Sequence, residues 1–162
     1  RTLSFRFIHK RNGPAKNPEA LDNYRPLRPV RGKEDPEQVK QIEFWDRVEE
    51  IGITDAAAQI SANRFRVAFD KLDVDLADTQ YLLGNDLTVL DIAWFVYANR
   101  LVLAGYPIER LHPNVWIWFL QLRDQPEFAK QVTRPQEFFD AVAVYQQEQA
   151  AAGATLAQVA GF

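Results

Sequence analysis

The chain has 162 residues, of which 47% are hydrophobic and 25% charged, a composition that excludes a disordered tail and fits one domain with a buried core. The absence of cysteine excludes disulfides, thiolate zinc sites and cysteine nucleophiles. No apolar run approaches the roughly 20 residues of a membrane span, and the two histidines, His9 and His112, have no acidic or histidine partner at ligand spacing, so we expect no metal site.

Charge is unevenly distributed, because residues 1–33 hold nine Lys/Arg against two acidic residues, whereas the rest of the chain holds ten against twenty. A basic segment on an acidic body could steer anions such as nucleic acid or an acidic small molecule. The arginines share no helical face and aromatic residues do not interleave with them, so a solvated loop is favoured over a nucleic-acid site. The chain begins at Arg1 without a methionine, from which we expect that residues precede it in the natural protein.

The first part of the chain is predicted to hold a helix and a long loop. Residues 1–11 could form one amphipathic helix, although Phe5 and Phe7 on a period of two leave the choice open. Residues 12–36 contain five of the nine prolines, and proline both removes a donor and disfavours helix in the residue before it. A long irregular, Pro-rich loop is therefore predicted over this range.

Two amphipathic helices are predicted next. The first runs from Asp35, with Pro36 at its first helical position, to about Glu50. The second can be capped by Thr54 and ends near residues 82–85. The residues expected to form their buried stripes are Val39, Ile42, Trp45 and Val48 in the first helix, and Phe65, Phe69, Leu72 and Leu76 in the second. No stretch alternates as several strands would, so the predicted class is all-α.

The most informative pattern begins at Thr88, where a helix N-cap is expected. Asp91 follows three residues later, so the two side chains can satisfy each other's backbone N–H groups as a capping box. Leu87 and Ile92 occupy the two positions of a hydrophobic staple. The sequence after this start is apolar on every side, which predicts a buried central helix at about 88–104. A carboxylate at this position is expected to be structural rather than catalytic.

Residues 81–128 resemble the C-terminal domain of bacterial-type glutathione transferases. The shared pattern is a leucine-glycine stretch that leads into a threonine cap, an Asp-Ile pair and a buried helix. The next helix of the family is matched by His112-Pro113-Asn114-Val115-Trp116, and Gln125-Pro126-Glu127-Phe128 resembles the segment that follows. The resemblance implies a glutathione-transferase C-terminal-like helical bundle, with the chain 1–162 as a single helical domain.

The resemblance also implies an N-terminal thioredoxin-like domain that is absent from this chain. In the family, that domain binds glutathione and supplies the residue that activates its sulfur, so no catalytic residue is assigned here. A last helix is predicted at about 135–151, with Phe138 on its apolar face. The tail 146–162 could be a lid over the electrophile site, as in several family members, or a frayed terminus.

By position in the family, the candidate residues of the electrophile wall are Phe5, Ile8, Trp45 and Tyr97. Each of these side chains could instead belong to the core. Arg1 or Arg6 could lie near an anionic group of a ligand, and His112 is expected to be a capping or turn residue. The resemblance therefore places binding residues in this chain and leaves the chemistry to the missing half.

The function implied by the resemblance is a helical domain that lines the hydrophobic electrophile site for glutathione conjugation. Glutathione would be the co-substrate, bound mainly by the missing domain, and the protein would be a cytoplasmic homodimer with no membrane partner. The alternative is a non-catalytic interaction module, because similar helical domains occur in translation factors and aminoacyl-tRNA synthetases. The parent protein would be a transferase in the first case only.

Overall fold

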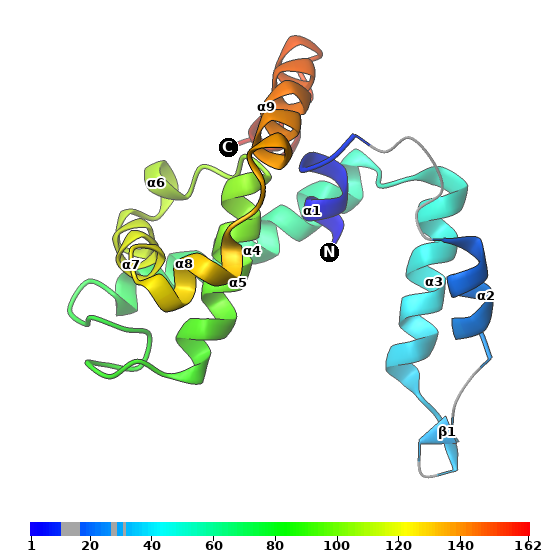
Figure 1. The fold of residues 1–162 in the computed structure, drawn as a ribbon, viewed down its shortest axis with the longest axis horizontal. Coiled ribbons are helices and arrows are strands. Elements are labelled where there is room, and N and C mark those ends of the chain that lie inside the picture. The colour runs from blue at the N-terminus through cyan, green and yellow to red at the C-terminus, as the bar shows by residue number, and fades with distance from the viewer. Residues whose placement is uncertain (11–16, 27–28, 31) are drawn as a thin grey trace. The chain divides into compact units, whose positions relative to one another are not determined.

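The computed structural model describes residues 1–10, 17–26, 29–30 and 32–162 of the chain. These residues fall into two compact units (Figure 1), where the sequence predicts a single domain. Unit 1 consists of residues 1–10 and 55–162, and unit 2 lies within residues 11–54. The predicted N-terminal helix, the family-like segment and the C-terminal helix thus share unit 1, and the predicted loop and the helix after it form unit 2.

Helices make up nearly all of the regular structure. Those of unit 1 are α1 (Thr2–Phe7), α4 (Asp55–Asp75), α5 (Val89–Leu103), α6 (Ile108–Leu111), α7 (Pro113–Arg123), α8 (Pro126–Val132), α9 (Gln136–Ala151) and α10 (Leu156–Ala160). Unit 2 contains α2 (Pro18–Tyr24), β1 (Pro29–Val30), β2 (Lys33–Glu34) and α3 (Pro36–Ile51), with β1 and β2 paired antiparallel. The prediction of an all-α fold is confirmed. None of the described helices has the length and hydropathy to cross a bilayer.

The prediction of a continuous irregular loop over 12–36 is wrong for its described part. Asn17 caps α2, because its side chain accepts hydrogen bonds from the backbone N–H groups of Glu19 (3.0 Å) and Ala20 (3.5 Å). Pro18 takes the first helical position, where a missing N–H costs nothing. Proline thus starts a helix here instead of excluding one. The first residues of the predicted loop, 12–16, lie outside the described part of the chain.

Unit 2 is held together by polar contacts between α2 and α3. The buried side chain of Gln38 donates through Nε2 to the backbone oxygens of Tyr24 (2.7 Å) and Pro26 (3.0 Å), which fixes the end of α2 against α3. The guanidinium of Arg25 pairs with the carboxylate of Asp46 at 2.6 Å. The predicted start of α3 is confirmed, since Asp35 is the N-cap and accepts from the N–H of Glu37 at 3.0 Å.

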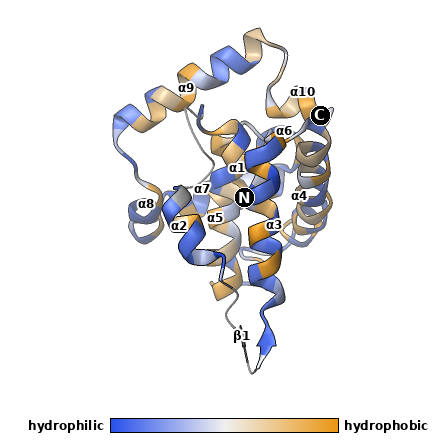
Figure 2. Cartoon of the chain, turned by 90° about the vertical axis from the view of Figure 1, so that its right-hand side faces the viewer, coloured by the Kyte–Doolittle hydropathy of each residue, from blue (hydrophilic) through white to orange (hydrophobic). Residues whose placement is uncertain are grey.

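Unit 1 has one hydrophobic core, to which α1, α4, α5 and α7 contribute. Figure 2 shows hydrophobic and hydrophilic residues alternating along the helices, as amphipathic helices require. The largest fully buried side chains in the core of unit 1 include Phe7, Phe69, Phe95, Trp118 and Phe119. The rings of Phe95 and Phe119 stack with centroids 5.4 Å apart. The core thus joins α5 directly to α7.

The predicted central helix is present as α5, but only one of its faces is enclosed. Phe95, Ala98 and Leu101 are at most 3% exposed, whereas Val89 and Ile92 are 80% and 50% exposed. A helix whose sequence is apolar on every side is therefore not necessarily buried on every side by other residues of the same chain. A stripe of exposed apolar residues on one helix is typical of a surface that contacts another domain or subunit.

Candidate functional site

The start of α5 is organised around one buried carboxylate. Asp91 is fully buried, and its Oδ1 accepts hydrogen bonds from the backbone N–H of Leu82 (2.9 Å) and from the indole N–H of Trp118 (3.0 Å). Its Oδ2 accepts from the backbone N–H (2.9 Å) and the hydroxyl (2.7 Å) of Thr88. Thr88 and Asp91 also form a capping box across the first turn. Asp91 therefore ties the preceding loop and α7 to the start of α5.

The hydrogen bonds at Asp91 outweigh the effect of burial on its ionisation. Burial alone raises the pKa of this carboxyl, but the bonds from Leu82, Thr88 and Trp118 together hold its pKa below the ordinary value. The carboxylate is thus charged at neutral pH and is fully occupied as an acceptor. Leu87 and Ile92, the residues of the predicted staple, are 43% and 50% exposed and lie at the surface beside this cap.

The helix α7 is capped from another helix. Asp73, near the end of α4, accepts through Oδ1 from the backbone N–H groups of Asn114 (2.8 Å) and Val115 (3.0 Å). The side chain of Asn114 donates in return to the backbone oxygen of Asp73 at 3.0 Å. His112 lies at the turn between α6 and α7, as the C-cap residue of the first and the N-cap residue of the second, which agrees with the expected capping or turn position, although its side chain makes no capping hydrogen bond.

We expect Asp73→Ala to lower the free energy of unfolding by about 1 to 2 kcal/mol, because two N–H groups at the start of α7 lose their acceptor. Urea unfolding followed by circular dichroism measures the change. Asp75→Ala is the matched control, since Asp75 is an exposed carboxylate on the same helix. Equal losses in the two variants would refute the capping role of Asp73.

His112 is buried beside Tyr106. The Nε2 atom of His112 lies 2.9 Å from the Tyr106 hydroxyl, and its Nδ1 has no hydrogen-bond partner among the described residues, with Asp70 Oδ1 at 3.4 Å. Burial lowers the pKa of His112, an effect that Asp70 and Asp73 oppose and Arg66 reinforces. Burial also raises the pKa of Tyr106. Both rings are therefore neutral at pH 7, and one hydrogen bond joins the Tyr106 hydroxyl to Nε2, its direction set by which ring nitrogen of His112 carries the proton.

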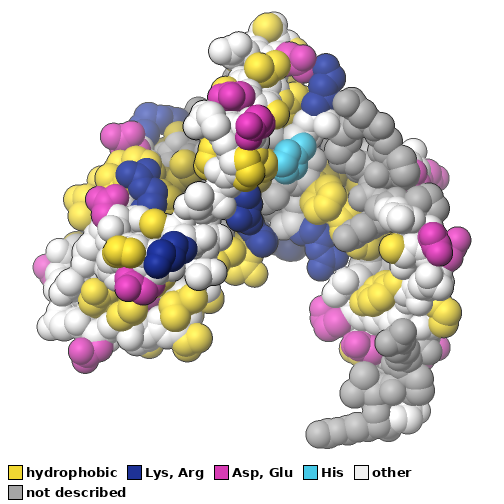
Figure 3. Space-filling view, in the orientation of Figure 1, with side chains coloured by type: hydrophobic (Ala, Val, Ile, Leu, Met, Phe, Trp, Pro, Cys, Tyr) yellow, Lys and Arg dark blue, Asp and Glu magenta, His cyan; other side chains and the backbone are white. Residues whose placement is uncertain are grey.

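A cavity of about 360 Å³ lies between α1, α5, the end of α8 and α9. Its apolar lining residues are Phe5, Ile8, Val96, Leu103, Val132 and Phe138, and its polar lining residues are Ser4, His9, Asn99, Arg100, Gln131 and Arg134. The face drawn in Figure 3 carries a histidine with Lys and Arg side chains close by, among hydrophobic side chains. The volume is within the range of small-molecule sites.

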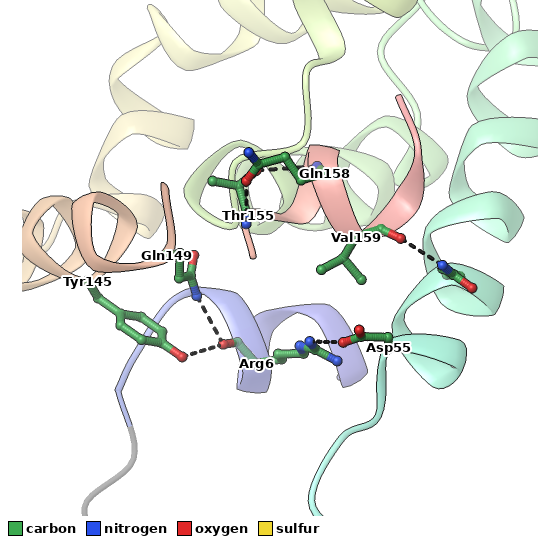
Figure 4. Close-up of polar contacts among 8 residues, drawn as sticks. Arg6, Asp55, Tyr145, Gln149, Thr155, Gln158 and Val159 are labelled. Carbon is green, nitrogen blue, oxygen red and sulfur yellow. Dashed lines mark hydrogen bonds and ion pairs between the residues drawn. The ribbon is translucent and has the colours of Figure 1, made fainter. Parts of the chain in front are cut away.

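One wall of the cavity, α1, is fixed by long-range polar contacts (Figure 4). The hydroxyl of Tyr145 donates to the backbone oxygen of Arg6 at 3.0 Å, and the guanidinium of Arg6 pairs with Asp55 at the start of α4. Lys10 and Glu148 form a further ion pair at 2.8 Å. A wall that is tied to both α4 and α9 holds the cavity open in a defined shape.

The tail does not cover this cavity. Gln59 on α4 donates to the backbone oxygen of Val159 at 2.9 Å, and Thr155 and Gln158 form a capping box that starts α10 (Figure 4). Leu156 is 1% exposed. The tail is thus a docked helix on α4 that contributes no residue to the described lining, so the lid alternative does not hold for this cavity.

The structure brings together two of the four predicted wall residues. Phe5 and Ile8 line the cavity between α1 and α9. Tyr97 lies elsewhere on α5, with its ring centroid 5.9 Å from that of Phe65. Trp45 belongs to unit 2, where it lines a separate cavity of about 210 Å³. The four residues therefore do not form one site within either unit.

Sequence reasoning missed the charged part of the cavity. Val96, Asn99 and Arg100 come from one face of α5, at the spacing of one helical turn, and the same face continues to Leu103. The helical spacing of these residues shows that they share a face. Because most of the helix is apolar on every side, however, the sequence does not indicate which face lines a cavity. Arg134 follows α8 and was not distinguished from other surface charges.

Comparison with known proteins gives one match. Residues 53–120 match the family model of the glutathione S-transferase C-terminal domain. The match spans α4, α5, α6 and most of α7, and it contains both the Asp91 cap and the Asp73 cap. No curated protein and no solved structure matches the chain. Residues 53–120, which contribute α4, α5 and α6 and most of α7 to unit 1, thus resemble the glutathione S-transferase C-terminal domain.

Proposed function

We propose that this chain is the helical half of a glutathione S-transferase, and that its cavity between α1, α5 and α9 holds the electrophile during conjugation to glutathione. The observation that carries the proposal is the position of this cavity, which is walled by α5 of the family-matched segment. Its apolar side chains, such as Phe5, Ile8 and Phe138, suit a hydrophobic or aromatic molecule.

The proposed roles of the helical half and of a thioredoxin-like domain follow from the chemistry of glutathione conjugation. The nucleophile in conjugation is the thiolate of glutathione, which needs a hydrogen-bond donor or positive field to form at neutral pH. In the family this group lies in a thioredoxin-like domain, and glutathione binds mainly there. The helical half would hold the electrophile in line with the sulfur, which accelerates reaction by proximity and orientation.

The exposed stripe of α5 supports the further proposal of a partner domain or subunit. Val89, Ile92 and Tyr97 are 46% to 80% exposed, and burial of such side chains is favourable by about 1.5 to 3 kcal/mol each when complete. We propose that the protein acts as a cytoplasmic homodimer in which surfaces of this kind are covered. Sedimentation of the complete natural protein at several concentrations measures its oligomeric state.

The complete natural protein should be retained on immobilised glutathione and should conjugate an aromatic halide such as chlorodinitrobenzene. Val96→Trp should then raise KM for the halide about tenfold, because the larger ring occupies the cavity, and leave KM for glutathione unchanged. Val67→Trp is the matched control, because Val67 is 62% exposed on α4, does not line the cavity and lies outside the exposed stripe of α5.

Two outcomes would contradict the proposal. A complete protein without glutathione-dependent activity would favour the non-catalytic interaction module. Unchanged kinetics in Val96→Trp, with activity intact, would place the electrophile outside this cavity.

A further inference from the structure

The cavity proposed for the electrophile has a charged edge that a purely apolar molecule would not use. Its lining includes Arg100 on α5, Arg134 between α8 and α9, and His9 after α1, and none of the described lining residues is acidic. The ring of His9 packs edge-on against Phe138 with centroids 5.3 Å apart. Two arginines, an imidazole and aromatic rings thus line one small volume.

The two arginines lack carboxylate partners in the described part of the chain. Arg134 donates only to the backbone oxygen of Thr133, at 3.0 Å, and Arg100 has no ion pair with a described residue. Other cations near α1 are already used, since Arg6 pairs with Asp55 and Lys10 with Glu148. An arginine beside apolar surface without a counterion favours a planar anion, to which it can donate two parallel hydrogen bonds.

From this arrangement we infer that the cavity binds an amphipathic anion: an aromatic body against Phe5, Ile8 and Phe138, and a carboxylate or sulfonate at Arg100 and Arg134. The inference rests on the proposed function, because it names the class of electrophile, an aromatic acid, that the cavity would select. The chain carries a net charge of -3, so the attraction comes from these local charges and not from the molecule as a whole.

A matched pair of ligands tests this inference. Naphthaleneacetate and its uncharged amide have nearly the same shape, so calorimetric titration of the chain with each isolates the effect of the charge. The acid should bind about tenfold more tightly than the amide, and added salt should weaken only the acid. In Arg100→Gln and in Arg134→Gln the ratio of the two affinities, acid over amide, should fall towards one. In Arg110→Gln the ratio should stay the same, because Arg110 is exposed and lies outside the cavity.

The outcomes separate this inference from the proposed function. Equal binding of acid and amide would overturn the anion preference and leave the cavity as an apolar site. A preference that survives in the double variant Arg100→Gln, Arg134→Gln would also overturn it. If neither ligand binds, both the inference and the cavity proposal fail. Displacement of the acid by glutathione would assign the charged edge to the carboxylates of glutathione, which overturns its assignment to the electrophile.

Discussion

Replacing Asp91 by alanine is expected to lower the free energy of unfolding by about 3 to 4 kcal/mol. The carboxylate is fully buried and accepts four hydrogen bonds, from the Leu82 N–H, the Trp118 indole, and the N–H and hydroxyl of Thr88. Alanine leaves these donors in the interior without an acceptor, and water has no direct access to replace it. Urea unfolding followed by far-ultraviolet circular dichroism measures the loss.

Two variants calibrate this loss. Asp86→Ala removes an exposed carboxylate from the same loop and should change the free energy of unfolding by at most about 0.5 kcal/mol. Trp118→Phe removes one of the four donors and keeps most of the ring, so it should cost about 1 kcal/mol beyond the small loss of packing. Equal stability of Asp91→Ala and Asp86→Ala would show that the buried cap does not stabilise the fold.

The same network has a pH signature. The pKa of Asp91 is lower in the folded chain than its ordinary value of 3.8, so the charged carboxylate contributes stability above that pH. The contribution is lost as the pH falls through the folded-state pKa. The difference in stability between the wild type and Asp91→Asn should therefore be constant from pH 5 to 7 and shrink below about pH 3.8.

The sequence predicts the contacts of this cap between neighbouring residues, but it does not predict its contacts with residues far away in the sequence. Thr88 and Asp91 are three residues apart, and a capping box depends only on that spacing. The indole of Trp118 is 27 residues away from Asp91, and the Asp73 cap on Asn114 joins residues 41 apart. Pairs of this kind depend on how α4, α5 and α7 pack, which no local pattern encodes.

The candidate site shows the same division. Position within the family places Phe5 and Ile8 at a wall of the cavity in unit 1, whereas Trp45 lines the cavity of unit 2. Arg100 was hidden because the residues before it on α5 are apolar on every side. A periodicity argument needs a polar face to orient a helix, and α5 has none over most of its length.

Lowering the pH from about 6.5 to about 5 is expected to destabilise unit 1 through His112, with a slope of up to about 1.4 kcal/mol per pH unit. Burial lowers the pKa of His112 in the folded state; Asp70 and Asp73 oppose this shift, and Arg66 adds to it. Below pH 6.5 the unfolded chain therefore binds a proton that the folded chain does not. Stability falls with pH until the folded-state pKa is reached, and an NMR titration of the His112 ring measures that pKa directly.

His112→Gln removes the titrating group, so its stability should lose this dependence on pH between 6.5 and 5. Tyr106→Phe is the matched control, because it removes the hydroxyl that lies 2.9 Å from Nε2 and keeps the histidine. Its free energy of unfolding should be lower by about 1 kcal/mol at pH 7, and its dependence on pH should persist. Burial without a full hydrogen-bond partner must disfavour the charged form of the His112 ring. A ring that titrates at or above pH 6.5 in the folded chain would therefore contradict this account. The same slope of stability against pH in His112→Gln as in the wild type would also contradict it.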